Sequence, residues 1–381
     1  MKIGIITFWN SQDNYGQLLQ CFALQHYLKK KGHQPFLIRY IPQVKTKTKL
    51  ERIASLWKLL SPTHLNAYKK FIEDQKKSAI FDAKNPRYFD DFRAEHIDFS
   101  SSIYRNLNDL KNENWDADAF ICGSDQIWSY SPIKENIEAF FLQFAPKTSK
   151  VIAYAASFGR PELPPDYLKM LPNMLNKFHA VGLREETGVT LCKKANRSDA
   201  SLVCDPTLLL MGSDYIASIV KKEVKETNTV FTYLLNWETD FPLDEIKTIM
   251  ASENLEMNFI GAHGMENRNL FPFFDDLRIA SWLQKMASSK YSFTNSFHGT
   301  VLSILLKRSF VTFPLSGVSA KMNGRITTLL SLLGLEDRIY TPGKSIEEIL
   351  KQPIDWDLVE EKLNAFRGES ASFLEKSLQG E

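Results

Sequence analysis

The sequence predicts an α/β fold in which two domains, each built on a parallel sheet, face a cleft. Short apolar runs that suit strands alternate with helical patterns along most of the chain, as in a parallel sheet covered by helices. This alternation breaks at Asp205-Pro206-Thr207, and a new series then begins. The length of 381 residues also exceeds the usual size of one domain.

The first unit of the chain is predicted to be a strand, a helix and a strand. Residues 3–8 form the first strand, and residues 15–31 form a helix with an apolar face that stops at Gly32. Residues 35–40 form the second strand. Further strands are predicted at 119–123, 151–157, 180–183 and 202–204, and a second series at 230–235, 257–261, 291–294 and 310–313.

These patterns predict three parts: an N-terminal α/β domain over 1–205, a C-terminal α/β domain over 212–345 and a helical tail over 346–381. The tail has an amphipathic pattern from Asp355 to Leu378 and can pack on either domain.

Composition excludes several classes of function. The 47 basic and 45 acidic residues leave a formal charge of +2, without the basic excess typical of nucleic-acid-binding proteins. Four cysteines without a CxxC pair, and no His at metal-ligand spacing, favour reduced thiols and predict no metal site. No secretory signal and no apolar run of about 18 residues is present. We therefore expect a cytoplasmic protein that binds no nucleic acid.

Residues 45–77 depart from this neutral average. They hold nine basic and three acidic residues, a net charge of +6. Apolar residues at helical spacing and a second helix after Pro62 predict a helical hairpin; the apolar face consists of Leu50, Ile53, Ala54, Trp57 and Leu60. One interpretation is a solvated hairpin that covers the sheet. The other is a peripheral contact with the inner face of the membrane, through anionic lipid or a lipid-linked substrate.

Familiar catalytic motifs are absent from the sequence. There is no GxGxxG after the first strand and no GxxxxGK[ST], GxSxG or HExxH. Nicotinamide redox chemistry, P-loop hydrolysis and the common hydrolase and zincin mechanisms are therefore disfavoured.

Polar residues follow the predicted strands, at the edge where parallel sheets bind ligands. In Asn14-Tyr15-Gly16-Gln17, glycine permits close approach to the backbone and a helix begins; the alternative is a plain turn and cap. Ser124, Asp125 and Gln126 follow the strand at 119–123, and Asp125 can either activate a hydroxyl or cap the next helix.

Cationic residues follow other strands. Arg184 suits bidentate capture of a carboxylate or phosphate, or else an ion pair with Glu185, Glu186 or Asp205. Lys321 and Arg325 precede a predicted helix at 326–333, where they can hold an anion or form plain surface.

His298 is the most informative histidine. It lies in Ser296-Phe297-His298-Gly299-Thr300, a strand-to-helix turn in which an imidazole can act as a general acid or have a structural role. Asn236 and His263 are polar residues that follow two other predicted strands of the C-terminal domain.

In their order along the chain, these motifs resemble the polysaccharide pyruvyl transferase family. The resemblance runs from residue 1 to about 335 and leaves out residues 45–77 and the tail. It is carried by Lys2-Ile3-Gly4-Ile5, Asn14-Tyr15-Gly16-Gln17-Leu18-Leu19-Gln20, Gly123-Ser124-Asp125-Gln126-Ile127-Trp128, Tyr154-Ala155-Ala156-Ser157-Phe158-Gly159, Arg184-Glu185, Asp205-Pro206-Thr207 and Ser296-Phe297-His298-Gly299-Thr300.

The resemblance implies a GT-B-like pair of Rossmann-like domains, with the acceptor on the N-terminal side and the donor on the C-terminal side. Family members move the enolpyruvyl group of phosphoenolpyruvate onto two hydroxyls of a sugar, forming a pyruvate ketal and releasing phosphate, in cell-surface or capsular polysaccharide assembly. It implies phosphoenolpyruvate as donor substrate, no cofactor, and a sugar or lipid-linked oligosaccharide as acceptor. The oligomeric state stays open.

By the same resemblance, His298 corresponds to the histidine near the donor, and Arg184 to an arginine that holds its anionic groups. Members with a studied donor site carry Arg-Leu-His where this chain has Ser296-Phe297-His298, so the second donor arginine is absent. One guanidinium cannot satisfy both a carboxylate and a phosphate. We therefore expect Arg325, with Lys321 and the turn at Ser296, Gly299 and Thr300, to complete the donor site.

In the expected mechanism, His298 transfers the proton and Asp125 orients or activates the acceptor. The acceptor is expected to contact Asn14, Tyr15, Gly16, Gln17, Ser124 and Gln126. A GT-B glycosyltransferase with a nucleotide-sugar donor, and a non-catalytic carbohydrate-binding relic, are the alternatives.

Overall fold

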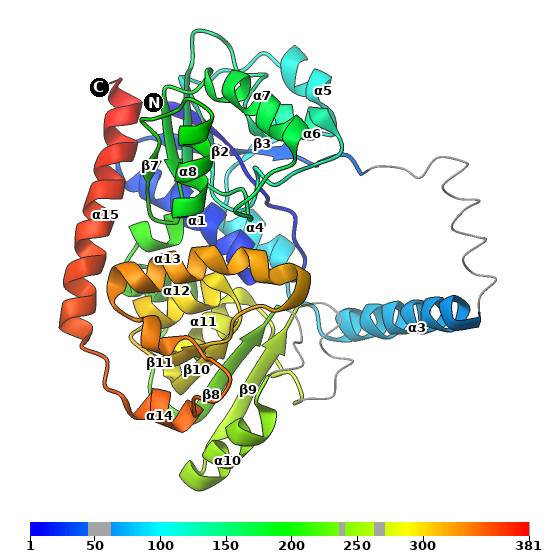
Figure 1. Cartoon of the computed structure of the whole chain (residues 1–381), viewed down its shortest axis with the longest axis vertical. Helices are drawn as coiled ribbons and strands as arrows, with labels where there is room; N and C mark the ends of the chain where they lie inside the picture. The colour runs from blue at the N-terminus through cyan, green and yellow to red at the C-terminus, as the bar shows by residue number, and fades with distance from the viewer. Residues whose placement is uncertain (45–61, 236–240, 263–270, 381) are drawn as a thin grey trace.

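Two parallel sheets organise the chain. The computed structural model describes residues 1–44, 62–235, 241–262 and 271–380. The larger sheet has the strand order β3-β2-β1-β4-β5-β6-β7, and the smaller has the order β11-β10-β8-β9 (Figure 1). All of their strand pairs are parallel. The predicted α/β class is confirmed.

The predicted strands are present, with ends shifted by a few residues. The larger sheet consists of β1 (Lys2–Ile6), β2 (Gln34–Tyr40), β3 (Phe99–Tyr104), β4 (Ala119–Cys122), β5 (Lys150–Ala156), β6 (Ala180–Leu183) and β7 (Ser201–Leu202). The smaller consists of β8 (Thr227–Leu234), β9 (Glu256–Gly261), β10 (Ser289–Thr294) and β11 (Ser309–Thr312). Strand β3 was not predicted, because this edge strand exposes three consecutive residues and has no apolar run.

The α-helices are α1 (Tyr15–Lys30), α3 (Pro62–Lys84), α4 (Phe89–His96), α5 (Leu107–Asn112), α6 (Lys134–Phe140), α7 (Pro165–Leu175), α8 (Glu186–Lys194), α9 (Gly212–Tyr215), α10 (Leu243–Glu253), α11 (Ile279–Ser288), α12 (Phe297–Leu305), α13 (Gly324–Leu333), α14 (Ile346–Lys351) and α15 (Trp356–Gln379). Shorter helical turns are η1 (Pro206–Leu209), η2 (Ile216–Val220), η4 (Gly317–Asn323) and η5 (Glu336–Arg338). Helices α1, α3, α13 and α15 confirm four predicted helices. The predicted apolar face from Leu50 to Leu60, and also Asn236 and His263, lie outside the described residues.

Helix α1 lies between the two halves of the molecule and is buried on nearly all sides, as expected of a helix at the centre of a core. One continuous hydrophobic core includes apolar residues of both halves. The Tyr15 ring stacks on Trp282 of α11 at 5.2 Å, and its hydroxyl donates to the Leu277 carbonyl at 2.6 Å. The beginning of α1 is thereby held against the second half.

The C-terminal helix α15 packs on both halves, whereas the sequence left either one open (Figure 1). Lys150 Nζ of β5 donates to the Leu378 carbonyl at 2.5 Å, and Lys362 Nζ of α15 donates to the Leu333 carbonyl of α13 at 3.4 Å.

The domain boundaries at 205, 212 and 345 stay predictions. In the part of the chain that the structure describes, no helix is both long and apolar enough to cross a membrane.

Candidate functional site

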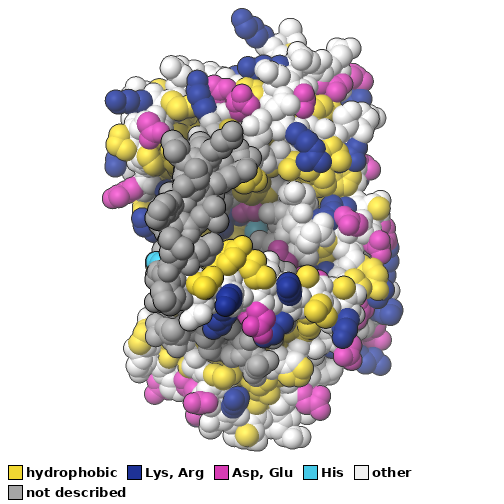
Figure 2. Space-filling model, turned by 90° about the vertical axis from the view of Figure 1, so that its right-hand side faces the viewer, with side chains coloured by type: hydrophobic (Ala, Val, Ile, Leu, Met, Phe, Trp, Pro, Cys, Tyr) yellow, Lys and Arg dark blue, Asp and Glu magenta, His cyan; other side chains and the backbone are white. Residues whose placement is uncertain are grey.

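Six ionisable side chains meet where the two halves join, and we call them the charge cluster. Asp125 follows β4, Arg184 and Glu185 follow β6, and Asp205 lies just after β7, so the larger sheet supplies four of them from the carboxyl ends of its strands. The second half supplies the other two, His298 in the first turn of α12 and Arg325 in the first turn of α13. On the face seen in Figure 2 the molecule is hollowed between its halves, and acidic and histidine side chains are visible in the hollow.

Asp205 is the fully buried centre of the charge cluster. Its Oδ2 accepts hydrogen bonds from Ser124 Oγ at 2.5 Å and Arg184 Nη1 at 2.8 Å, and His298 Nε2 lies 3.6 Å from the same oxygen. Its Oδ1 accepts from the backbone and side chain of Thr207 at 3.0 and 2.6 Å. Burial would raise the pKa of Asp205, but His298, Arg184 and Ser124 together hold it well below its ordinary value. Asp205 is therefore ionised and is the counter-ion of Arg184.

Arg184 forms the ion pair with Asp205 that was one of its alternative roles. Burial alone would lower the pKa of Arg184, but the carboxylates of Asp205, Asp125 and Glu185 raise it above its ordinary value. Within the described structure, its Nε and Nη2 have no hydrogen-bond partner, and neither has Nε2 of His298. Buried donors are normally satisfied, so these atoms are suited to a polar ligand.

Arg325 joins Arg184 at the Phe297 ring. The two guanidinium carbons lie 4.8 Å (Arg184) and 5.7 Å (Arg325) from the ring centroid. With its amide oxygen on that side, Gln126 accepts from both terminal nitrogens of Arg325, at 2.8 and 3.2 Å. Burial and the neighbouring Arg184 lower the pKa of Arg325 to about 10, so it stays charged at neutral pH. Lys321, by contrast, is exposed.

Gly16 explains how His298 reaches this position. A Cβ on Gly16 would lie 2.2 Å from His298 Nδ1, closer than atoms can approach, so the bare glycine lets the imidazole pack against the beginning of α1. The group that approaches this glycine is a side chain of the protein, and the approach of a ligand that the sequence predicts here stays a prediction.

Most of the expected acceptor contacts have partners within the protein. Tyr15 is fully buried, and its hydroxyl donates to the Leu277 carbonyl and accepts from Arg87. Ser124 is also fully buried, and its hydroxyl donates to Asp205 and accepts from Arg184. The structure therefore places Tyr15 in the contact between the two halves and Ser124 beside the charge cluster. A position at the end of a strand does not determine which way a side chain points. Asn14 caps α1, while the half-buried Gln17 and Gln126 retain the acceptor role as a prediction.

The beginning of α12 also differs from expectation. Ser296 Oγ accepts from the Gly299 N–H at 3.3 Å, and the Ser296 carbonyl accepts from the Thr300 N–H at 2.9 Å. Both amides, which were expected to help hold the donor, therefore serve the turn of their own helix. The structure places these three residues in the cap and first turn of α12, and their expected contact with the donor stays a prediction.

Asp125 occupies a constrained turn beside Arg184. Its φ of 80° lies in the left-handed region, which Asp tolerates better than most residues. Its Oδ1 accepts from the Gln126 N–H at 2.8 Å and lies 3.8 Å from Arg184 Nη2. Residues 125–133, all of them described, contain no helix, so the alternative interpretation as a helix cap is wrong.

Sequence reasoning gave neither Glu185 nor Asp205 a role in the site, although it named both as alternative ion-pair partners of Arg184 and as parts of the family motifs. Glu185 is buried, its Oε1 accepts from Ser157 Oγ at 2.9 Å and the Phe158 N–H at 3.1 Å, and its Oε2 has no described partner. Burial raises the pKa of Glu185 against the opposing charges of Arg184 and Arg325. The sequence did contain a signal for both acids, since Glu185 lies just after β6 and Asp205 just after β7.

Among the described residues, no group of three or more His, Cys, Asp or Glu side chains is placed to hold a metal.

Comparison with solved structures defines the class of fold. A putative UDP-N-acetylglucosamine 2-epimerase from Listeria monocytogenes is 9% identical with a TM-score of 0.50, over 96% of this chain and 90% of that one. The UDP-GlcNAc 2-epimerase from Methanocaldococcus jannaschii is 10% identical with a TM-score of 0.49, over 96% and 93%. At 9% identity the likeness to the Listeria protein concerns the fold alone, and the chain has the GT-B-like architecture of two Rossmann-like halves.

The family follows from a match to the sequence itself. The family model for polysaccharide pyruvyl transferase matches residues 14–317. The chain therefore belongs to the polysaccharide pyruvyl transferase family, a family of transferases. No curated protein matches it closely enough to count as a relative.

Proposed function

We propose that this enzyme transfers the enolpyruvyl group of phosphoenolpyruvate to two hydroxyls of a sugar, releasing phosphate and leaving a pyruvate ketal in a cell-surface or capsular polysaccharide. Beside its family membership, the observation that carries the proposal is the meeting of Arg184, Arg325 and His298 around Phe297 and Asp205. Two guanidinium groups suit a donor with two anionic groups, and the imidazole suits proton transfer.

The donor is proposed to bind at the two arginines. Arg184 keeps Nε and Nη2 for a ligand, while its Nη1 is held by Asp205 and Ser124. Because burial and the neighbouring Arg184 lower the pKa of Arg325, an anion bound between the two guanidinium groups would stabilise the charged form of Arg325. Arg325 thus supplies the cation that is absent at Ser296.

In the proposed reaction, His298 gives a proton to the methylene carbon, and the carbon that bears the phosphate becomes positively charged. A sugar hydroxyl attacks this carbon and gives its proton to the Asp125 carboxylate, and the carbon–oxygen bond to phosphate breaks with its electrons leaving on the phosphate. The second hydroxyl then attacks the same carbon, gives its proton to the departing phosphate and closes the ketal. Asp205 stabilises the imidazolium form of His298, and Asp125 orients or activates the acceptor.

The proposal is tested by phosphate release from phosphoenolpyruvate against a panel of sugar and lipid-linked acceptors, with mass spectrometry of the products. A pyruvyl adduct that forms in step with phosphate is the expected result. Hydrolysis of a nucleotide sugar, or tighter binding of a nucleoside diphosphate than of phosphoenolpyruvate, would instead support a glycosyltransferase. Ligand binding without any turnover would support the non-catalytic alternative.

Replacing Arg325 by Ala is expected to weaken phosphoenolpyruvate binding by about 10- to 100-fold, because a hydrogen bond to a charged group contributes about 1.5–3 kcal/mol. Titration calorimetry with phosphoenolpyruvate measures the change. Lys222→Ala, which removes an exposed cation outside the charge cluster, is the control and should leave the affinity unchanged. Lys321→Ala is measured as well, because the sequence also predicts this cation at the donor site. No loss of affinity in Arg325→Ala would remove Arg325 from the donor site.

The basic segment is proposed to bring the enzyme to an anionic membrane. Helix α3 extends away from the body of the molecule (Figure 1) and exposes four large apolar side chains by 38–58%, namely Leu65, Tyr68, Phe71 and Ile80. Lys69, Lys70, Lys76 and Lys77 lie on the same helix. Exposed apolar side chains beside lysines are typical of helices that lie on anionic lipid.

Leu65→Glu combined with Phe71→Glu is therefore expected to reduce binding to phosphatidylglycerol vesicles by at least about tenfold, since burying one such side chain contributes about 1.5–3 kcal/mol. Co-sedimentation measures the bound fraction. Leu168→Glu on α7 is the matched control, because Leu168 and Leu65 are both 38% exposed. Undiminished binding in the α3 variant, or none in the unaltered protein, would contradict the membrane contact.

A further inference from the structure

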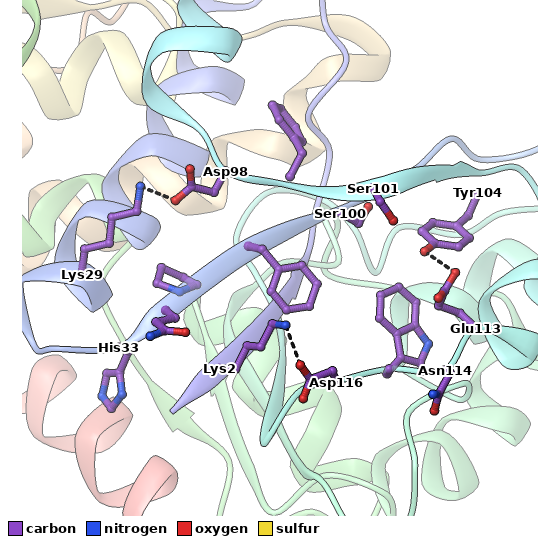
Figure 3. A pocket seen from close by; sticks show the side chains of 15 residues that line it. Lys2, Lys29, His33, Asp98, Ser100, Ser101, Tyr104, Glu113, Asn114 and Asp116 are labelled. Atoms are coloured by element: carbon purple, nitrogen blue, oxygen red, sulfur yellow. Dashed lines mark hydrogen bonds and ion pairs between the residues drawn. The ribbon is translucent and has the colours of Figure 1, made fainter.

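A cavity of about 550 Å³ lies in the larger half, beside β2 and β3 (Figure 3). None of the residues that line it belongs to the charge cluster. Lys2, Gln34 and Phe99 line it, and they are the first residues of β1, β2 and β3. The charge cluster lies at the carboxyl ends of the strands, so the two sites begin at opposite edges of the sheet. Five residues of β1 separate these edges by roughly 16 Å. The cavity volume is typical of small-ligand sites.

Aromatic rings form one wall of this cavity. The rings of Phe36 and Trp115 are nearly parallel, with 6.3 Å between centroids and 19° between planes, and Tyr104 lies 5.3 Å from Trp115. Phe36 and Trp115 are only half-buried. The indole nitrogen of Trp115 donates to the Leu110 carbonyl at 2.8 Å, so the ring presents apolar surface to the cavity. Such a wall suits the C–H face of a pyranose ring.

Paired polar groups surround the aromatic wall. Lys2 pairs with Asp116 at 2.8 Å, Lys29 pairs with Asp98 at 2.7 Å, and the Tyr104 hydroxyl donates to Glu113 at 2.8 Å (Figure 3). Two ammonium groups face three carboxylates, so the lining is close to neutral and slightly acidic. Because both lysines already have counter-ions, a phosphate or nucleotide is disfavoured. Neighbouring donors and acceptors suit sugar hydroxyls, which both donate and accept.

We propose that this cavity is a second saccharide-binding site, which holds a neutral sugar unit of the glycan while a different unit reacts at the charge cluster. The assignment of that glycan as the acceptor rests on the proposed function. The binding of a sugar in the cavity does not rest on it. A second contact raises the effective concentration of a long acceptor at the reacting site without changing the chemistry there.

A glycan array of neutral bacterial and plant oligosaccharides, followed by saturation-transfer NMR with the hits and with ATP, tests the proposal. Trp115→Ala is expected to lower the affinity for the hits by at least about tenfold, as for an aromatic side chain at the centre of a binding site. Because Trp115 also packs on Phe120 and Phe144, the double variant Asn114→Ala, Asp116→Ala provides a second test on two exposed residues. Asp91→Ala, an exposed acid on α4, is the control and should bind normally.

Phosphate release with a monosaccharide acceptor is measured on the same variants and is expected to be unchanged, whereas the KM for a long acceptor should rise. Three results would each overturn the inference. The first is an array without hits, the second is oligosaccharide binding that persists in both cavity variants, and the third is ATP binding that these variants abolish. If the unaltered protein releases no phosphate, the proposed function fails while the binding result still stands or falls by itself.

Discussion

Asp205→Asn is expected to destabilise the protein by about 3–5 kcal/mol, the largest stability effect that the structure predicts. The substitution leaves Arg184 buried and charged without its counter-ion, which costs far more than an exposed pair contributes. Both side chains are at most 1% exposed, and 2.8 Å separates Arg184 Nη1 from Asp205 Oδ2. Urea denaturation followed by circular dichroism measures the free energy of unfolding.

The chain offers a control, an exposed ion pair with the same nitrogen–oxygen distance. Arg197 and Asp199 are also 2.8 Å apart, but the Asp199 side chain is 61% exposed. Asp199→Asn should therefore change the free energy of unfolding by less than about 1 kcal/mol. If the two variants lost the same stability, burial would not be what makes the Asp205 pair important.

The pH dependence of this contribution follows from the direction of the pKa shift. The pKa of Asp205 is lowered in the folded protein, so its ionisation stabilises the fold above the unfolded pKa of about 4. That contribution is lost only as the pH falls through the lower folded value. The ionisation of Asp205 itself should therefore cause no loss of stability between pH 5 and pH 8.

His298→Gln is expected to reduce phosphate release from phosphoenolpyruvate by about 10²- to 10⁴-fold, the range in which general acids contribute. The proposed proton donor is removed, while a polar side chain still fills the space against Gly16 and near Asp205. Initial rates of phosphate release measure the loss, and calorimetry shows whether phosphoenolpyruvate still binds.

A structural role for His298 predicts a different pattern. The melting temperature would fall and phosphoenolpyruvate binding would weaken together with the rate. Proton transfer by His298 instead predicts a low rate in a protein that is folded and binds the donor. Near-normal turnover in His298→Gln would exclude this histidine from the mechanism.

Much of the fold was predictable because parallel strands are buried on both faces and appear as short apolar runs. The structure confirms β6 at Ala180–Leu183, the range that the sequence predicted. Strand β3 was not predictable in this way, since Ser101, Ser102 and Ile103 face solvent at the edge of the sheet. The helix at α1 was predictable, but its burial between two halves depends on residues of α11 and α12 that follow more than 200 positions later.

The candidate site was predictable in part for the same reason. His298, Arg184 and Asp125 were found because they follow strands, and Arg325 because the charge of the expected donor required another cation. Position along a strand does not say whether a side chain faces a ligand or a neighbouring element. That is why Tyr15 and Ser124 were expected at the acceptor and instead lie buried in the protein.

The sequence by itself determined the alternation of strands and helices, the order of motifs that identifies the family and the positions of the residues able to carry the chemistry. These properties depend on neighbours in the chain. Only the tertiary structure decided that Asp205 pairs with Arg184 and lies 3.6 Å from His298 Nε2, and that Arg325 meets Arg184 at Phe297. The approach of His298 to Asp205 and that of Arg325 to Arg184 join residues of the two halves of the molecule, and the packing of α1 between these halves sets the distances over which the charges act.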